Sequence, residues 1–208
     1  MSQTEVQLIK ADAVQTADIA NSAVTDAKIS ALTSSKLTGA LPAISGASLT
    51  NLPAGGKFAS YAIICDQKAT DANGGSSSTG QFFVRDLNTE LADPDGIVSI
   101  SSNQFTLQAG TYLLKASAPA QGAARHQIII NNATDSAVAV LGMNAYSNSS
   151  SVTTSRAFAS GRVTIGSAKV FEIRHRVESA RSTDGLGVAC NFDLLASIYT
   201  LVEIYKES

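Results

Sequence analysis

The sequence predicts a mainly β protein, in which an antiparallel β-sandwich over residues 57–208 follows a repetitive segment over 13–56. Two observations support this prediction. The seven Phe and five Tyr residues all follow the glycine pair at 55–56, and the residues before that pair are mostly Ala, Ser, Thr and Asp with isolated Val, Ile and Leu. After it, short apolar segments alternate with turn sequences, which is typical of a sandwich or jelly roll.

Large apolar residues recur every five positions in the repetitive segment. A period of five places successive side chains about 140° apart around a helix and on opposite faces of a strand, so neither element collects them on one side. Repeats this short cannot bury their apolar groups within one chain. We therefore expect a fibre-like shaft of several chains, in which these side chains point at a shared axis: Val14, Ile19, Val24, Ile29, Leu32 and Leu37.

Two other interpretations of this segment stay open. Small residues from Ala13 to Ala31 follow the heptad spacing of a coiled coil, although that seam would be almost all methyl groups and would leave Ile19 and Ile29 outside it. A stretch rich in Ala, Ser and Thr is also compatible with a disordered linker. The multi-chain shaft is the interpretation that accounts for the five-residue interval.

Ten segments of the second part are predicted strands, separated by turn sequences such as Asp-Pro-Asp-Gly at 93–96. Short strands at this spacing predict two packed sheets. The segments are 58–66, 81–87, 97–101, 104–108, 111–118, 126–131, 136–142, 156–165, 169–177 and 196–206.

The first and last of these strands are apolar on both faces. A sandwich strand buries one face in its own core, so the other face needs a separate cover. The simplest cover is another copy of the same domain. The residues predicted to face that copy are Tyr61, Ile63, Tyr199, Leu201 and Tyr205.

Composition and motifs argue against several classes of function. Charged residues make up 15% of the chain and the net charge is -2, so neither nucleic acid nor an anionic membrane is implied as a partner. The first residues lack a signal-peptide pattern, and no apolar run is long enough to span a bilayer. No metal-binding, nucleophile-elbow or phosphate-loop motif is present, so we expect no enzyme activity, no cofactor and no metal.

The histidines and cysteines are expected to be structural. His126 opens an Ile-rich strand and His175 lies on the apolar side of its strand, so a core or interface position is expected for each. Cys65 and Cys190 are far apart in apolar surroundings, and we expect them as unpaired thiols.

Long polar loops are the expected place for a binding site, because loops on a rigid β scaffold commonly carry binding specificity. They are predicted at 67–80, 119–125, 143–155 and 179–187. The large side chains there that could stack on a sugar or pair with an anionic one are Arg125, Tyr146 and Arg181. Ordinary solvated loop residues are the alternative interpretation for all three.

Four stretches of the sequence resemble fibre and virion structural proteins of tailed bacteriophages that end in a C1q/TNF-like jelly roll. They are GALPAISGASLTNLPAG (39–55), RDLNTELADPDGIVSISSNQFTLQAGTYLLKASAPA (85–120), FEIRHRVESARSTDGLGVACNF (171–192) and IYTLVEIYK (198–206). The resemblance implies a homotrimer in which the first and last strands lie side by side in the sheet that faces the threefold axis. That expectation agrees with the two apolar faces of these strands.

The resemblance also implies a function. Residues 1–12 would attach the protein to other phage virion proteins, residues 13–56 would form the shaft, and the jelly-roll head over 57–208 would bind a host cell-surface glycan or protein. The protein would be a virion component on the tail or capsid surface, assembled in the host cytoplasm. The alternative is a purely structural head decoration or fibre-attachment protein without receptor binding. An enzymatic hypothesis, a polysaccharide depolymerase, would need a carboxylate pair in a groove, and none is evident in the sequence.

Overall fold

The computed structural model describes residues 57–208 and, before them, only the single positions 20 and 25. The six residues predicted to line the shaft axis lie outside the described residues: Val14, Ile19, Val24, Ile29, Leu32 and Leu37. The predictions for residues 1–12 and 13–56 therefore stay predictions.

Residues 57–208 form strands joined by turns and loops, and in this part of the chain there is no helix long and apolar enough to cross a membrane. The strands are β1 (Phe58–Lys68), β2 (Phe83–Val84), β3 (Thr89–Ala92), β4 (Val98–Ser101), β5 (Gln104–Leu107), β6 (Gly110–Gln121), β7 (Ala124–Asn132), β8 (Ala137–Ser147), β9 (Thr154–Ile165), β10 (Lys169–Val177) and β11 (Ser197–Glu207).

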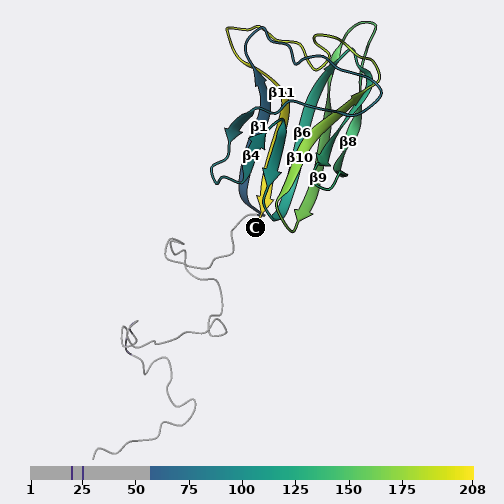
Figure 1. Cartoon of the computed structure of the whole chain (residues 1–208). Helices are drawn as coiled ribbons and strands as arrows, with labels where there is room; N and C mark the ends of the chain where they lie inside the picture. Colours follow the sequence, from purple (N-terminus) through teal and green to yellow (C-terminus); the bar gives the residue numbers. More distant parts are fainter. Residues whose placement is uncertain (1–19, 21–24, 26–56) are drawn as a thin grey trace, which may run out of the picture. The chain divides into compact units, whose positions relative to one another are not determined.

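The strands build two antiparallel sheets that pack face to face as a jelly roll (Figure 1). The first sheet has the order β3-β1-β11-β6-β9, and the second has the order β8-β7-β10-β5-β4, with β2 added beside β10. In both sheets, apart from the hairpins β4–β5 and β7–β8, the paired strands are distant in sequence, which is the Greek-key connectivity of a jelly roll. β1 and β11 are hydrogen-bonded neighbours, as expected for the first and last strands.

The two ends of the sandwich differ. The chain enters and leaves at one end, where Phe58 pairs with Glu207 and the Ser208 amide donates a hydrogen bond to the Lys57 carbonyl at 3.2 Å. The antiparallel pairing then places the ends of β6, β8 and β10 at the opposite end, where the longer loops gather (Figure 1). We call this the loop end.

Alternate residues of the strands fill the space between the sheets. Ile64 and Ile204 from the first sheet and Ile130 and Ile173 from the second are fully buried, and each contributes about 1.5–3 kcal/mol through removal of apolar surface from water. The side chains between these inward positions point outward, as the period of two requires.

The strand predictions are confirmed with two differences. The segment 81–87 forms a strand only at Phe83–Val84, and Thr89–Ala92 forms a strand that was not predicted. Beyond Val84, the Arg85 amide still donates to the Ile173 carbonyl at 2.8 Å, and the Arg85 side chain is buried. Cys65 is buried and unpaired as expected, whereas Cys190 is unpaired but exposed, because it lies in the loop before β11.

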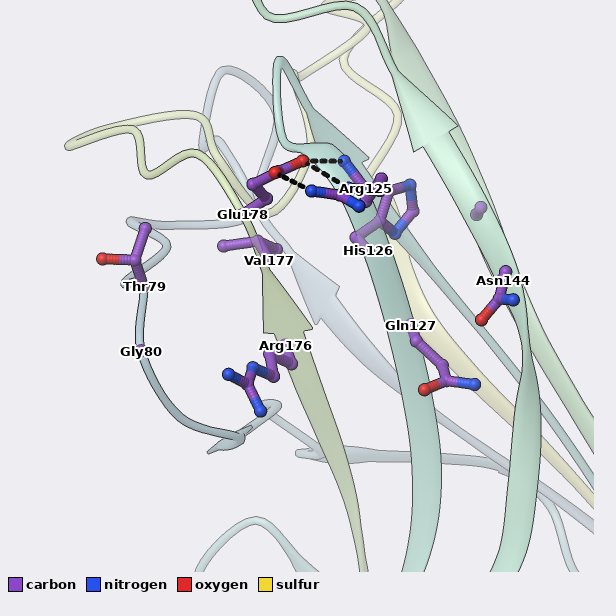
Figure 2. Close-up of a pocket in the computed structure, with 10 residues that line it drawn as sticks. Thr79, Gly80, Arg125, His126, Gln127, Asn144, Arg176, Val177 and Glu178 are labelled. Atoms are coloured by element: carbon purple, nitrogen blue, oxygen red, sulfur yellow. Dashed lines mark hydrogen bonds and ion pairs between the residues drawn. The ribbon is translucent and has the colours of Figure 1, made fainter.

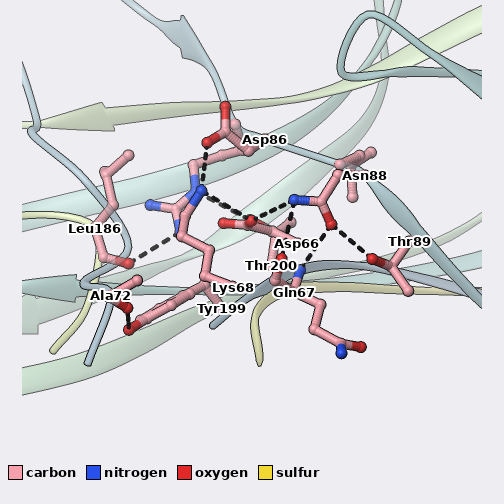
Figure 3. Close-up of polar contacts among 12 residues, drawn as sticks. Asp66, Gln67, Lys68, Ala72, Asp86, Asn88, Thr89, Leu186, Tyr199 and Thr200 are labelled. Carbon is pink, nitrogen blue, oxygen red and sulfur yellow. Dashed lines mark hydrogen bonds and ion pairs between the residues drawn. The ribbon is translucent and has the colours of Figure 1, made fainter. Parts of the chain in front are cut away.

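The Arg85 guanidinium is completely buried at the loop end and ties several segments together. Figure 3 labels two of its partners, Leu186 and Thr200. The guanidinium donates hydrogen bonds to the Thr200 hydroxyl at 3.1 Å and to the carbonyls of Pro119 and Leu186 at 3.2 and 3.0 Å. Burial lowers its pKa to about 10, so the group stays charged at neutral pH. The nearby Asp66 carboxylate supplies compensating negative charge.

A buried histidine pair links the two sheets beside Arg85. His126 Nδ1 lies 3.0 Å from His175 Nε2, and His126 Nε2 lies 2.7 Å from the hydroxyl of Ser155 on β9. Burial first, and the charge of Arg85 second, lower the pKa of His126 to about 4 and that of His175 well below its ordinary value. Both imidazoles are therefore neutral in the folded protein.

The sheets also meet where β8 and β9 pair through Gly142 and Ala159. A Cβ atom at position 142 would lie 2.2 Å from the Ile128 carbonyl oxygen and 2.8 Å from that of Phe158. Only glycine therefore fits at this contact between the sheets without a shift of the backbone.

We expect Gly142→Ala to lower the free energy of unfolding by roughly 1–3 kcal/mol, because the backbone at Ile128 or Phe158 must move to make room for the added Cβ. Denaturant titration measures this change. Gly166→Ala is the matched control, since no atom lies within 4 Å of its Cβ position. Equal unfolding midpoints for the two variants would contradict this.

The neutral histidine pair makes the free energy of unfolding depend on pH. The pKa of His126 is about 4 in the folded chain and near 6.5 without these surroundings, so the unfolded chain binds more protons below pH 6.5. Stability should be highest above pH 6.5 and fall as the pH drops toward 4, by up to about 1.4 kcal/mol per pH unit for each histidine. Denaturant unfolding across this range measures the slope.

The control for the pH experiment is the double variant His126→Gln/His175→Gln. It keeps polar groups at both positions and removes both titrations, while every carboxylate stays the same. Its stability should vary less with pH between 6.5 and 4 than that of the unchanged protein. Slopes that are identical in the two proteins would show that the histidines do not set the dependence.

Candidate functional site

The outer face of the first sheet carries apolar side chains on its central strands. Along neighbouring strands, Tyr61 pairs with Tyr205, which in turn pairs with Leu113. Further along β11, Leu201 continues the apolar surface. Tyr61 is 45% exposed, and the others remain partly exposed in the single chain. The sequence prediction of a second apolar face on β1 and β11 therefore corresponds to a real surface, which we call the sheet face (Tyr61, Ile63, Leu113, Leu201 and Tyr205).

Polar groups on this sheet are paired with one another. The Tyr205 hydroxyl donates to Glu203 at 2.8 Å, and Lys115 lies 5.6 Å from the centre of the Tyr205 ring. Toward the chain-terminus end, Arg162 makes two hydrogen bonds of 2.9 Å to Glu207. The charges of Arg162 and Glu207 thus compensate each other, which lowers the cost of covering that end of the sheet.

Tyr199 does not belong to the sheet face, contrary to expectation. Its side chain is buried within its own chain, and its hydroxyl donates to the Ala72 carbonyl at 2.6 Å. Its ring packs so closely on Gly74 and Gly187 that a Cβ at either glycine would approach within 3 Å. The residue is covered because the loops on both sides of the sandwich fold over the start of β11.

A second apolar surface lies along the edge where β8 and β9 meet. Leu141 and Met143 on β8 are 68% and 61% exposed, and Val138 on the same strand and Phe158 on β9 are also exposed. Large side chains this exposed on one edge are more than the isolated apolar residues of an ordinary surface. We call this surface the strand edge (Val138, Leu141, Met143 and Phe158).

A groove of about 590 Å³ opens on the second sheet at the loop end (Figure 2). Its walls come from the first residues of β7, the end of β10, part of β8, and the loop at Thr79 and Gly80. This volume lies within the range of about 300–1,000 Å³ that is usual for small-molecule sites. The groove is thus large enough for a ligand of one or two rings.

The charges in the groove are one ion pair and one additional arginine. Arg125 Nε donates to Glu178 Oε2 at 2.9 Å, and a second hydrogen bond joins Arg125 Nη2 to Glu178 Oε1. These hydrogen bonds lower the pKa of Glu178 to about 2. Arg176 also lines the groove, and within residues 57–208 its side chain makes no hydrogen bond or ion pair. Its positive charge is therefore available to a ligand.

The three predicted ligand-binding residues do not form one site. Arg125 lines the groove, and Tyr146 is exposed opposite it in the pairing of β7 with β8. Arg181 is instead bound to Asp184 by hydrogen bonds of 2.6 and 2.9 Å and packs over Gly122.

Two of the predicted loops, 119–125 and 143–155, are shorter than expected. β6 and β7 leave only residues 122–123 between them, and β8 extends to Ser147.

Sequence reasoning missed Arg176 as a site residue. The alternation of Phe171, Ile173, His175 and Val177 with charged residues indicated an ordinary half-buried strand, and that strand is present. The pattern could not show which outward charge lacks a partner. Among the described residues, no group of three or more His, Cys, Asp or Glu side chains is placed to hold a metal ion.

No protein-family model and no curated protein sequence matches this chain. Among solved structures, the chain is similar to murine APRIL at pH 5.0, with 7% identity and a TM-score of 0.46 over 71% of this chain and 98% of that one. It is also similar to the globular domain of the zebrafish complement 1qA protein, with 11% identity and a TM-score of 0.46 over 71% of this chain and 96% of that one. These similarities concern the fold, and the jelly-roll assignment rests on the strand order above.

Proposed function

We propose that this protein is a homotrimeric bacteriophage fibre protein, a non-enzymatic virion component whose jelly-roll head binds a glycan or protein on the host-cell surface. The proposal depends mainly on the exposure of the sheet face in a single chain. Apolar side chains on the two strands that begin and end the head domain are left partly exposed in a single chain. A contiguous apolar surface of this kind marks an interaction site.

The presence of two different apolar surfaces supports a ring of copies. A twofold dimer uses one surface twice, whereas a closed ring needs one surface on each copy to contact a different surface on the next. The sheet face and the strand edge are such a pair, because they lie on different strands of the same domain. The resemblance of the sequence to C1q/TNF-like phage proteins implies that the ring has three members.

The two ends of the head domain suit a role in host recognition. The chain enters at Lys57 and ends at Ser208 on one end, and the groove lies at the other. A virion attachment through residues 1–12 and a shaft over 13–56 would therefore join the domain at the end away from the groove. Several heads on one particle would allow weak individual binding to give stable adsorption through avidity.

A charge placed on the sheet face should prevent assembly. We expect the unchanged chain to have three times the 21.4 kDa mass of one chain by light scattering, and Leu201→Glu to shift the population toward single chains. Val84→Glu is the control, since Val84 is also an apolar residue with an exposed side chain but lies on β2, beside the second sheet. A single-chain mass for the unchanged protein, or an unaffected trimer in Leu201→Glu, would contradict the proposal.

Host recognition is tested separately from assembly. The labelled full-length protein should bind selected members of an array of bacterial surface glycans, or intact host bacteria, and unlabelled protein should displace it. A purely structural head decoration or fibre-attachment protein would show no such binding. Failure to bind any surface by a protein that is trimeric would favour that alternative and reject receptor binding.

A further inference from the structure

We infer that the groove at the loop end binds an acidic sugar carrying a single carboxylate, and that Arg176 holds that carboxylate. This inference deepens the proposed role in host recognition and rests on it for its biological meaning. The site is not one that the sequence predicted, since neither Tyr146 nor Arg181 lines the groove.

Among residues 57–208, the side chain of Arg176 has no partner, unlike the charged side chains on either side of it along the chain. Glu172 is paired with Arg174 at 2.5 Å, and Glu178 is paired with Arg125. Arg176 lies between these two ion pairs and has no partner in the described part of the chain. Figure 2 shows its side chain extending toward the loop of Thr79 and Gly80. An arginine left unpaired at a groove is well suited to bind a carboxylate through two hydrogen bonds.

The described residues that line the groove carry a net charge of one positive unit. The charges of Arg125 and Glu178 cancel, and His126 is neutral because burial and the charge of Arg85 lower its pKa to about 4. One positive charge remains, on Arg176. A ligand with one negative charge is therefore matched, whereas a doubly charged phosphate would be disfavoured by the Glu178 carboxylate.

Neutral polar side chains that can still form hydrogen bonds also line the groove. Asn144 and the Thr79 hydroxyl make no side-chain hydrogen bond within residues 57–208. Gln127 uses its Nε2 to donate to the Gly142 carbonyl at 2.7 Å, which leaves its Oε1 as an acceptor. Donors and acceptors of this kind bind sugar hydroxyls. The exposed ring of Tyr146, opposite Arg125, adds an aromatic surface beside the groove.

The test is a calorimetric or NMR titration of the full-length protein with D-glucuronate, D-glucose and acetate. Glucose carries the hydroxyls without the charge, and acetate carries the charge without the hydroxyls. We expect saturable glucuronate binding at least about tenfold tighter than that of either partial ligand. No saturable glucuronate binding, or acetate binding of equal strength, would overturn the inference.

Two variants and a control locate the site. Arg176→Gln should weaken glucuronate binding about tenfold or more, because it removes the one uncompensated charge among the described residues that line the groove. Lys169→Gln removes the same charge from the same strand outside the groove and should leave binding unchanged. Glu178→Gln should tighten binding several-fold by removing a negative charge, an effect that damage to the fold would not produce. Equal affinities for Arg176→Gln and the unchanged protein would refute the assignment.

Failure of this inference can be told apart from failure of the proposed function. Arg176→Gln is expected to stay trimeric by light scattering, because Arg176 lies on neither the sheet face nor the strand edge. If it still adsorbs to host bacteria as well as the unchanged protein, the groove assignment fails and host recognition stands. If glucuronate binds but no host surface does, the groove assignment stands and host recognition fails.

Discussion

The structure depends on one constraint, which is that β1 and β11 carry apolar side chains on both faces. Their inward residues, including Ile64 and Ile204, fill the core and hold the first sheet against the second. Their outward residues, including Tyr61 and Leu201, are left partly in water by a single chain. A domain whose central strands are apolar on both sides gains stability from a partner as well as from its own core. In the proposed assembly, the same two strands would link folding to association.

Two of the buried polar clusters, the one around Arg85 and the histidine pair, lie at the loop end. Arg85 binds carbonyls from β6 and from the loop at Leu186, and the histidine pair joins β7 and β10 to β9. Buried charges are costly unless they are fully hydrogen-bonded, and such networks fix one geometry when they are. Of these groups, His126 also lines the groove, where Arg176 is exposed on the surface.

The strands were predictable from sequence because their alternation is strong and local, as along β10. The sequence predictions failed where contacts between distant segments of the chain decide the position of a residue. Pro119 resembles a turn residue, yet it pairs with Arg156 inside β6. Arg85 resembles an outward strand residue, yet it is fully buried. The groove brings Thr79 and Arg176 together from segments far apart in the chain, and no local pattern could show that one arginine lacks a partner.

The most direct test of the central claim is an experimental structure of the full-length protein as it assembles in solution. Our account predicts copies arranged around a common threefold axis, with Leu201 and Tyr205 of one copy buried against the strand edge of the next. A solitary molecule with these side chains in water, or a twofold dimer that joins two sheet faces to each other, would contradict it.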